Sequence, residues 1–340
     1  MTLNDMMETK PLAKEPAIDV AGLTITARKE DGGSVPLVKD ISFACRAGEV
    51  TALIGESGSG KSLTAAALLG VLDAAVYDVC TQDLAIARYR ATTYDAEALS
   101  PIRGRKVGYI VQDPGSALDP TMKIGDQLAE LFMIHRGMNH SAARVEVNRL
   151  LDLVRIPNAA ARYDDYPHAF SGGMKQRVII AGAVALSPEV LIADEPTTAL
   201  DVTVQAEILA LIDDLRTTYG MSVLLITHDL GVVYQVADHV IVMYAGRIVE
   251  KGPVETICTT PAHPYTAGLL ASVPDLSRSG AAIAAIPGNP PKPGQDQGCA
   301  FSPRCVRAQA VCTTDRPHLL QRAQSIAACH FPVTSGGHLG

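Results

Sequence analysis

The sequence has little that would tie it to a membrane interior, to nucleic acid or to secretion. None of its apolar runs reaches the roughly 18 residues of a membrane-spanning helix. The longest, Val178–Leu186 and Ser222–Thr227, have the length of core segments. Lysine and arginine form no run, so the electrostatic footprint of a nucleic-acid-binding protein is missing. Residues 1–16 contain no apolar segment of the kind that a signal peptide requires. We therefore expect a chain that stays in the cytoplasm and begins with a flexible tail at 1–16.

The composition is that of an ordinary globular protein. Of the 340 residues, 47% are hydrophobic and 19% are charged, and the formal net charge is −7. Such a chain can bury a sizeable core, and its length favours two domains. The acidic balance indicates solubility and no particular partner.

Short apolar runs that alternate with helical patterns predict an α/β fold with a largely parallel, helix-covered sheet. The expected strands are Ile18–Ala27, Leu37–Cys45, Val50–Ile54, Tyr109–Val111, Val190–Ala193, Val223–Thr227 and Val240–Met243. The expected helices are Lys61–Leu72, Ile124–Gly137, Ala142–Val154 and Val204–Tyr219, the last with Ile208, Leu209, Leu211, Ile212 and Leu215 facing inward. Prolines become dense after Gly252, which indicates a linker and a small C-terminal module.

The segment from Gly55 to Ser62, GESGSGKS, fits the phosphate-binding pattern G-x-x-x-x-G-K-S in full. It stands between a predicted strand and a predicted helix, which is the context that such a loop requires. Its glycines let backbone N–H groups wrap the phosphates, Lys61 reaches the outer phosphates, and the Ser62 hydroxyl ligates Mg²⁺. The sequence therefore predicts a nucleotide site at this loop.

Polar side chains follow three other predicted strands. Asp194 and Glu195 end one strand, and ligands gather at the carboxyl ends of such strands. Asp194 would hold Mg²⁺, and Glu195 would polarise an attacking water. Gln112 can reach Mg²⁺ and water, and His228 can contact the γ-phosphate. Asp201 either belongs to this site or caps the helix that follows it.

A second anion site is predicted at residues 171–176, which read SGGMKQ. The paired glycines and the helix-compatible run after them form a helix N-terminus with exposed N–H groups. Because residues 55–62 already provide a better phosphate cradle, the second site needs a phosphate from another source.

Together these motifs resemble the ATP-binding cassette (ABC) family over residues 18–252. They follow the family's order: a Walker A loop at 55–62, a Q-loop glutamine at 112, a signature motif at 171–176, Walker B acids at 194–195, a D-loop aspartate at 201 and a switch histidine at 228. The resemblance implies an ABC-type P-loop NTPase domain at 17–252. It would have an N-terminal antiparallel β subdomain and a helical subdomain at about 113–170. A C-terminal extension would occupy 253–340.

The resemblance also implies a shared active site, because two cassettes of this family face each other head to tail. Each signature motif caps the ATP on the partner's Walker A loop, so Ser171, Gly172, Gly173 and Gln176 would contact a partner's ATP. The implied catalytic residues are Glu195, His228 and Gln112, and the implied Mg²⁺ ligands are Ser62, Gln112 and Asp194. The implied ATP-binding residues are Gly55, Ser57, Gly58, Ser59, Gly60, Lys61, Ser62, Leu63 and Thr64. The first strand lacks the aromatic residue that the family stacks on adenine, and Arg28 is a candidate substitute.

Two short segments, Tyr166-Pro167-His168 and His263-Pro264-Tyr265-Thr266, resemble the oligopeptide/dipeptide/nickel importer branch. This resemblance implies an ATPase subunit on the cytoplasmic face of the membrane that energises import of di- and oligopeptides. Its partners would be a second ATPase and two integral permease subunits, with an extracytoplasmic peptide-binding protein as an indirect partner. A paralogue is favoured over an identical chain as the second ATPase. Nickel, a metal chelate or another small cargo is the alternative. A non-transport ATPase acting on nucleic acid or ribosomes is less favoured, because no long heptad run separates Lys61 from Ser171.

Four of the seven cysteines cluster near the C-terminus with the spacing C-x5-C-x6-C-x16-C: Cys299, Cys305, Cys312 and Cys329. In a reducing compartment such a cluster is more typical of a metal site than of disulfides. Four thiolates suit Zn²⁺ or an iron–sulfur cluster, and the spacing lacks the paired C-x2-C of structural zinc sites. The family resemblance favours a 4Fe–4S cluster over Zn²⁺, with unliganded core cysteines as the third alternative.

Overall fold

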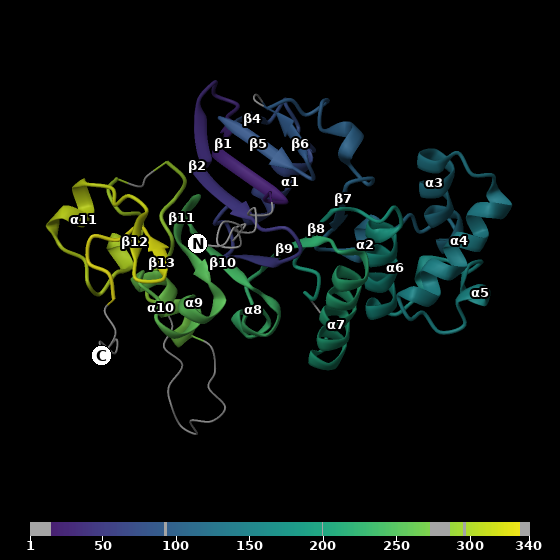
Figure 1. The fold of residues 1–340 in the computed structure, drawn as a ribbon. Helices are drawn as coiled ribbons and strands as arrows, with labels where there is room; N and C mark the ends of the chain where they lie inside the picture. The colour runs from purple at the N-terminus through teal and green to yellow at the C-terminus, as the bar shows by residue number, and fades with distance from the viewer. Residues whose placement is uncertain (1–14, 92–93, 199, 273–285, 295–296, 334–340) are drawn as a thin grey trace, which may run out of the picture.

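The computed structural model describes residues 15–91, 94–198, 200–272, 286–294 and 297–333 and contains two β-sheets, with helix α1 (Lys61–Leu69) packed between them and other helices around them (Figure 1). The antiparallel sheet contains β1 (Ile18–Arg28), β2 (Ser34–Cys45), β4 (Tyr77–Cys80), β5 (Asp83–Ile86) and β6 (Tyr89–Ala91). The second sheet has the order β12 (Leu320–Arg322), β13 (Ser325–Ala327), β11 (Arg247–Pro253), β10 (His239–Tyr244), β3 (Val50–Ile54), β9 (Ser222–Thr227), β8 (Val190–Asp194) and β7 (Val107–Ile110). The helices are α1 (Lys61–Leu69), α2 (Pro114–Ala117), α3 (Ile124–Arg136), α4 (His140–Leu153), α5 (Ala159–Arg162), α6 (Gly172–Val184), α7 (Val202–Tyr219), α8 (Leu230–Val236), α9 (Val254–Thr259), α10 (Pro264–Ala271) and α11 (Ala310–Thr314).

Five neighbouring strands of the second sheet, from β10 to β7, run parallel, so their carboxyl ends meet at one edge. At this edge β3 ends at Ile54 and leads into the loop at 55–60, while β8 ends at Asp194. β9 ends at Thr227, directly before His228, and pairs with β3 so that Thr227 lies opposite Ile54. The sheet topology therefore gathers the predicted phosphate loop, acids and histidine in one place.

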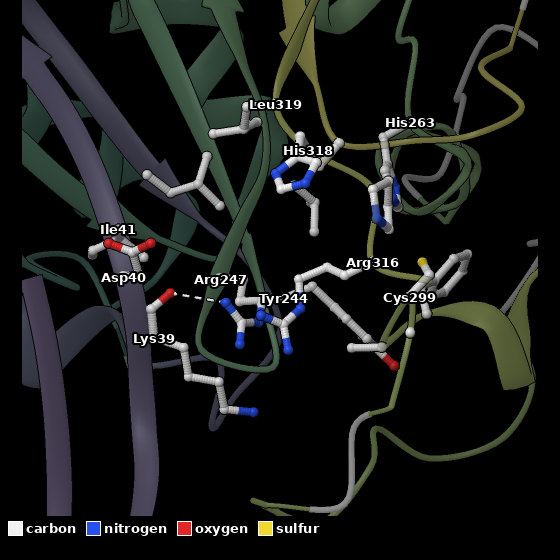
Figure 2. Close-up of a pocket in the computed structure, with 17 residues that line it drawn as sticks. Lys39, Asp40, Ile41, Tyr244, Arg247, His263, Cys299, Arg316, His318 and Leu319 are labelled. Atoms are coloured by element: carbon white, nitrogen blue, oxygen red, sulfur yellow. Dashed lines mark hydrogen bonds between the residues drawn. The ribbon is translucent and has the colours of Figure 1, made fainter. Parts of the chain in front are cut away.

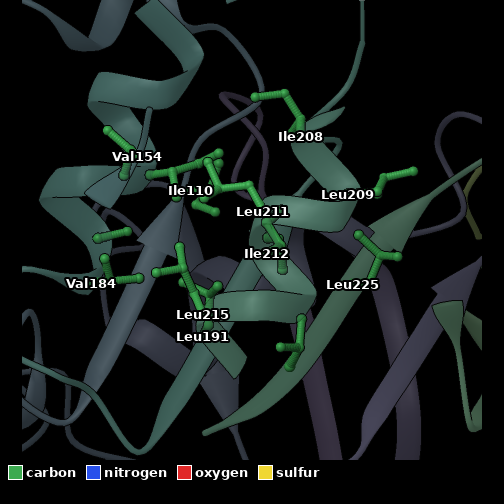
Figure 3. Packing of buried hydrophobic residues seen from close by; sticks show 14 of the residues in the cluster. Ile110, Val154, Val184, Leu191, Ile208, Leu209, Leu211, Ile212, Leu215 and Leu225 are labelled. Carbon is green, nitrogen blue, oxygen red and sulfur yellow. The ribbon is translucent and has the colours of Figure 1, made fainter. Parts of the chain in front are cut away.

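The central strands are buried on both faces, and their side chains alternate between two hydrophobic clusters. Leu191 and Leu225 pack toward α6 and α7 (Figure 3), whereas Ile192 and Leu224 pack toward α1 and the antiparallel sheet. Burial of each such side chain contributes about 1.5–3 kcal/mol. The five inward residues predicted for α7 are all buried, which confirms the helical periodicity of that segment.

Helices α3, α4 and α5 form a group at one end of the molecule, remote from the C-terminal strands (Figure 1). Tyr163 fixes this group: its ring is fully buried and its hydroxyl lies 3.1 Å from the Asp126 carboxylate. A Cβ at Gly125 would lie 2.2 Å from the Tyr163 ring, so α3 can approach that ring only with glycine here. Helix α6 packs against both α3 and α4 and joins the group to the sheet.

The C-terminal strands extend the main sheet: β13 pairs antiparallel with β11, and β12 pairs with β13. Composition alone did not predict this continuity, because each of these strands is only three residues long. The predicted strand Tyr109–Val111 starts two residues earlier, at Val107, and the predicted helix Lys61–Leu72 ends at Leu69, where Gly70 forms a left-handed C-cap. Within the described ranges, no helix combines the length and the apolar character needed to cross a membrane.

Candidate active site

The loop between β3 and α1 has a backbone that suits an anion. Gly55, Gly58 and Gly60 have φ angles of 153°, 79° and 103°, which non-glycine residues rarely adopt. A Cβ at Gly55 would lie 2.2 Å from the Met243 carbonyl oxygen, so a larger residue cannot be accommodated there. The Ser59 hydroxyl is buried and has no hydrogen-bond partner among the described residues. The loop therefore retains hydrogen-bonding capacity that a phosphate can use.

Lys61, the first residue of α1, folds back over the phosphate loop. Its Nζ donates to the carbonyl oxygens of Gly55 at 2.7 Å and Glu56 at 3.0 Å. Burial lowers the pKa of Lys61, while the carboxylates of Glu195, Asp194 and Glu56 oppose that shift. An ammonium that is poorly solvated in this way gains strongly from a phosphate oxygen.

Asp194 and Ser62 meet beside Lys61, at the carboxyl end of β8. The Ser62 hydroxyl lies 3.1 Å from Asp194 Oδ1, and the Tyr109 hydroxyl lies 3.4 Å from Asp194 Oδ2. Burial raises the pKa of Asp194, and the hydrogen bond from Ser62 acts in the opposite direction. A carboxylate and a hydroxyl beside a phosphate loop form the oxygen donor set that Mg²⁺ prefers, so the residues present fit this ion.

Glu195 is held in place by three polar side chains. Its Oε2 accepts hydrogen bonds from Gln112 Nε2 at 3.0 Å and Thr198 Oγ1 at 2.8 Å, and its Oε1 lies 3.2 Å from His228 Nδ1. Its φ angle of 47° lies in the left-handed region, and its N–H donates to the Ile226 carbonyl. Burial raises the pKa of Glu195, but the hydrogen bonds from Thr198 and His228, together with the charges of His228 and Lys61, outweigh burial, and the net pKa is lowered. The side chain is therefore a carboxylate at neutral pH, as a base must be.

The structure thus brings Gln112, Asp194, Glu195 and His228 together beside Lys61, as the sequence patterns predicted. The structure also places Thr198 in this group, a residue to which the sequence patterns gave no role. A hydroxyl three residues after the acid pair was the available signal. Of the remaining residues predicted to bind ATP, Thr64 donates to the Gly60 carbonyl at 2.9 Å, and Leu63 packs against the cluster beneath the antiparallel sheet.

The predicted second anion site is a helix N-terminus. Ser171 is the N-cap of α6, and its hydroxyl accepts from the Met174 N–H at 3.3 Å. Ser171 and Gly172 are exposed. Among the described residues, no hydrogen bond joins this stretch to the phosphate loop at 55–62. Asp201 is the N-cap of α7, with Oδ1 accepting from the Val204 N–H at 3.0 Å, and its assignment to the D-loop stays a prediction.

The C-terminal module contacts the phosphate loop directly. Arg304, whose side chain is 6% exposed, forms a two-pronged ion pair with Glu56, at 2.8 and 3.1 Å. The Tyr265 hydroxyl accepts from the Glu56 N–H at 2.9 Å, and Arg304 also donates to the Tyr244 hydroxyl at 3.2 Å. No local sequence pattern indicates the pairing of Arg304 with Glu56, because the two residues lie far apart in the chain.

A cavity of about 340 Å³ lies where the module meets β2 and the β10–β11 hairpin. Figure 2 looks into it, with Lys39 of β2 on one side and His263 and Cys299 on the other. Arg247 donates to the Lys39 carbonyl oxygen at 3.2 Å and links β11 to β2 across the cavity. Burial lowers the pKa of His263 to about 3, so this imidazole is neutral.

The four C-terminal cysteines line one small cavity, together with Phe301 and other side chains. The Cys299 N–H donates to the Cys312 carbonyl at 2.8 Å, which joins the segment around Cys299 to helix α11. Burial raises the pKa of the Cys329 thiol to about 11, and a metal site needs thiolates. In the part of the chain that the structure describes, no group of three or more His, Cys, Asp or Glu side chains is arranged to hold a metal ion. The geometry therefore gives the predicted 4Fe–4S or Zn²⁺ site no support beyond the shared cavity.

Two family models match the sequence. One, described as ABC transporter, matches residues 38–198. The other, described as the C-terminal region of oligopeptide/dipeptide transporters, matches residues 249–312. Between them they include the phosphate loop, the acid pair and the first three clustered cysteines.

Individual relatives match at greater length. The oligopeptide transport ATP-binding protein OppD of Salmonella typhimurium is 43% identical over 332 residues, covering 96% of this chain and 98% of that protein. The dipeptide transport ATP-binding protein DppD of Bacillus subtilis is 45% identical over 295 residues, covering 86% and 88%. Among solved structures, the dimeric post-hydrolysis state of the ATP-binding cassette MJ0796, bound to ADP and phosphate, has a TM-score of 0.60 at 25% identity. That match covers 70% of this chain and 98% of the solved one.

Proposed function

This chain belongs to the ABC transporter family and is an ATPase of that family, and we propose that it energises the import of di- and oligopeptides. The relatives named for oligopeptide and dipeptide transport match nearly the whole chain, including the region after the cassette. The match at residues 249–312 supports the peptide cargo, because that family model is itself described by oligopeptide/dipeptide transport, whereas the model at residues 38–198 names no cargo.

The observation that carries the proposed mechanism is the group around Glu195. We assign Lys61 and the N–H groups of residues 55–62 to the β- and γ-phosphates, because Lys61 Nζ already lies over this loop. Mg²⁺, held by Ser62, Asp194 and Gln112, would neutralise charge on those phosphates. Glu195 would then accept a proton from the attacking water, and His228 would hold the γ-phosphate. Gln112 joins the two roles, since it donates to the Glu195 carboxylate at 3.0 Å.

We further propose that two cassettes complete each other's sites. The exposure of Ser171 and Gly172 supports this assignment, since their N-terminal end of α6 is accessible to a phosphate on another molecule. ATP would join the two cassettes, and hydrolysis would release them. The solved relative that matches most of the cassette is itself dimeric and carries ADP and phosphate.

In this assignment the chain lies on the cytoplasmic face of the membrane, against two permease subunits and beside a second ATPase. We favour a paralogue over an identical chain as that second ATPase. A peptide-binding protein outside the cytoplasm would deliver cargo to the permeases. Closure and opening of the cassettes would be transmitted through Gln112 and helices α2–α5.

We retain the proposal that Cys299, Cys305, Cys312 and Cys329 hold a 4Fe–4S cluster, with Zn²⁺ as the alternative. The shared cavity of the four side chains supports it. Anaerobically purified protein is expected to show visible absorption and about four iron atoms per chain. Colourless protein with one zinc per chain would replace the cluster by zinc, and metal-free protein would leave the cysteines as core residues.

The proposed function is tested by purification from membranes followed by reconstitution. We expect two integral membrane proteins to copurify, and we expect ATP hydrolysis to rise when a peptide-loaded binding protein is added. Stimulation by a nickel- or chelate-loaded binding protein would change the cargo and leave the ATPase role intact. A stable complex with ribosomes or DNA, without membrane partners, would contradict transport.

A further inference from the structure

A cavity of about 280 Å³ borders the phosphate loop, and its walls come from distant parts of the chain. Residues 57–59 of the loop form one side. Pro36 of β2 and Ala245, just after β10, form the next. The segment Pro290–Pro293, which precedes the clustered cysteines, forms the last.

The residues assigned to hydrolysis do not line this cavity. Lys61, Asp194 and Glu195 are absent from its described lining, whereas Ser57, Gly58 and Ser59 belong to it. A triphosphate that is bound along the loop with its γ-phosphate at Lys61 has its nucleoside at some distance from these residues. The volume is close to the lower end of small-molecule pockets, which is about 300 Å³.

Arg304 joins the residues just before the segment Pro290–Pro293 to the loop. Its Nε donates to the Pro287 carbonyl oxygen at 2.9 Å, while the same guanidinium holds the Glu56 carboxylate. At the other end of the segment, a Cβ at Gly294 would lie 3.4 Å from the Val35 side chain of β2. The segment is thus held against both the loop and β2.

The residues of β1 do not offer a platform for a base. Ala27, which lies opposite Val35 of β2, has no ring. Arg28, the candidate substitute, is paired with Asp78 of β4, with Nε 2.9 Å from Oδ2. The guanidinium is therefore directed to the neighbouring strand, and the expectation that it stacks on adenine finds no support.

We propose that the segment Pro290–Pro293 forms the wall of the nucleoside site, so that the adenine and ribose of ATP lie between these prolines, Pro36 and the loop. The inference rests on the proposed function, in which residues 55–62 bind the triphosphate. Proline rings are apolar, and their fixed φ angle keeps such a wall in shape before the ligand arrives. The flat face of a purine loses contact with water against them. The C-terminal module thereby supplies part of the ATP site as well as contacting the loop.

The test compares ATP with inorganic tripolyphosphate, which has the phosphates and no nucleoside. In the full-length chain, the triple variant Pro290→Gly, Pro291→Gly, Pro293→Gly removes the rings and keeps the charge of Lys292. We expect its dissociation constant for ATP to rise about five- to tenfold, the lower part of what a base contact contributes. Binding of tripolyphosphate should stay within about twofold. Pro120→Gly, at an exposed proline before α3, is the matched control and should change neither.

If the triple variant binds ATP and tripolyphosphate equally more weakly, or binds both as tightly as the wild type, the proposed nucleoside wall is wrong and the phosphate site is unaffected. Failure of the wild-type chain to bind either ligand would overturn the proposed function itself. A second measurement does not depend on folding of the triple variant. Wild-type protein is irradiated with 8-azido-ATP, and we expect the label within residues 286–294. Labelling confined to β1 would refute the inference.

Discussion

Glu195→Gln tests the assigned base with little change in shape. Glu195 accepts from Gln112 and Thr198 through one oxygen and faces His228 Nδ1 through the other. A glutamine can keep its oxygen toward the two donors and turn its amide to the histidine nitrogen, which accepts when unprotonated. The loss of folding free energy should therefore stay below about 1.5 kcal/mol, the value of one hydrogen bond.

The expected loss of catalysis is much larger. A positioned general base contributes about 10²- to 10⁴-fold, which corresponds to roughly 2.7–5.5 kcal/mol of activation free energy. ATP affinity should change by less than about threefold, because Lys61 and the loop N–H groups are untouched.

Phosphate release and nucleotide binding are measured on the same preparation. Glu97→Gln, at an exposed glutamate outside the site, is the control. Wild-type turnover in the Glu195→Gln protein would refute the assignment of the base. If the Glu195→Gln protein loses both ATP binding and turnover, Glu195 acts on the phosphates and not on the water.

Three further outcomes follow from the same geometry. Lys61→Ala removes charged hydrogen bonds to phosphate and should weaken ATP binding about 10- to 100-fold in a fluorescent-nucleotide titration, and unchanged affinity would contradict the role of this lysine. The net pKa of Glu195 is lowered from its ordinary value of 4.5, so its carboxylate stays charged as pH falls through the neutral range. The pH profile of kcat/KM should therefore show no acidic decline from this group until pH 4.5 or below. A decline near pH 6 that Glu195→Gln abolishes would contradict the lowered pKa. Arg304→Met leaves the half-buried Glu56 without its cation and should lower the free energy of unfolding, measured in urea, by about 2–4 kcal/mol. Adding Glu56→Gln to this variant should recover part of that loss. Strictly additive effects of the two substitutions would contradict an interaction between Arg304 and Glu56.

The central fold and the meeting of Gln112, Glu195 and His228 could be predicted because their signals are local. The loop at 55–62 is a contiguous pattern, and the four apolar residues Val190–Ala193 before Asp194 and Glu195 indicate a buried strand whose carboxyl end carries the acids. The periodicity of α7 gave its buried face correctly because its apolar positions repeat every three or four residues.

The remaining features depend on contacts between distant residues. The pair of Arg304 and Glu56 spans 248 positions, and nothing near either residue indicates it. The strands β4, β5 and β6 are three or four residues long, too short for an alternating pattern to be recognised. Proline density at 287–293 indicated a linker, whereas in the structure part of this segment lines a cavity against the phosphate loop.

The most direct test of the account measures ATP turnover per chain as a function of chain concentration. If each active site combines one chain's phosphate loop with another chain's Ser171–Gln176 stretch, turnover per chain should rise with concentration or on addition of the partner ATPase. Nucleotide binding should persist in the dilute monomer. Ser171→Arg should abolish the rise and leave nucleotide binding at Lys61 intact. Turnover per chain that stays constant and brisk in a chain shown to be monomeric would contradict the shared site.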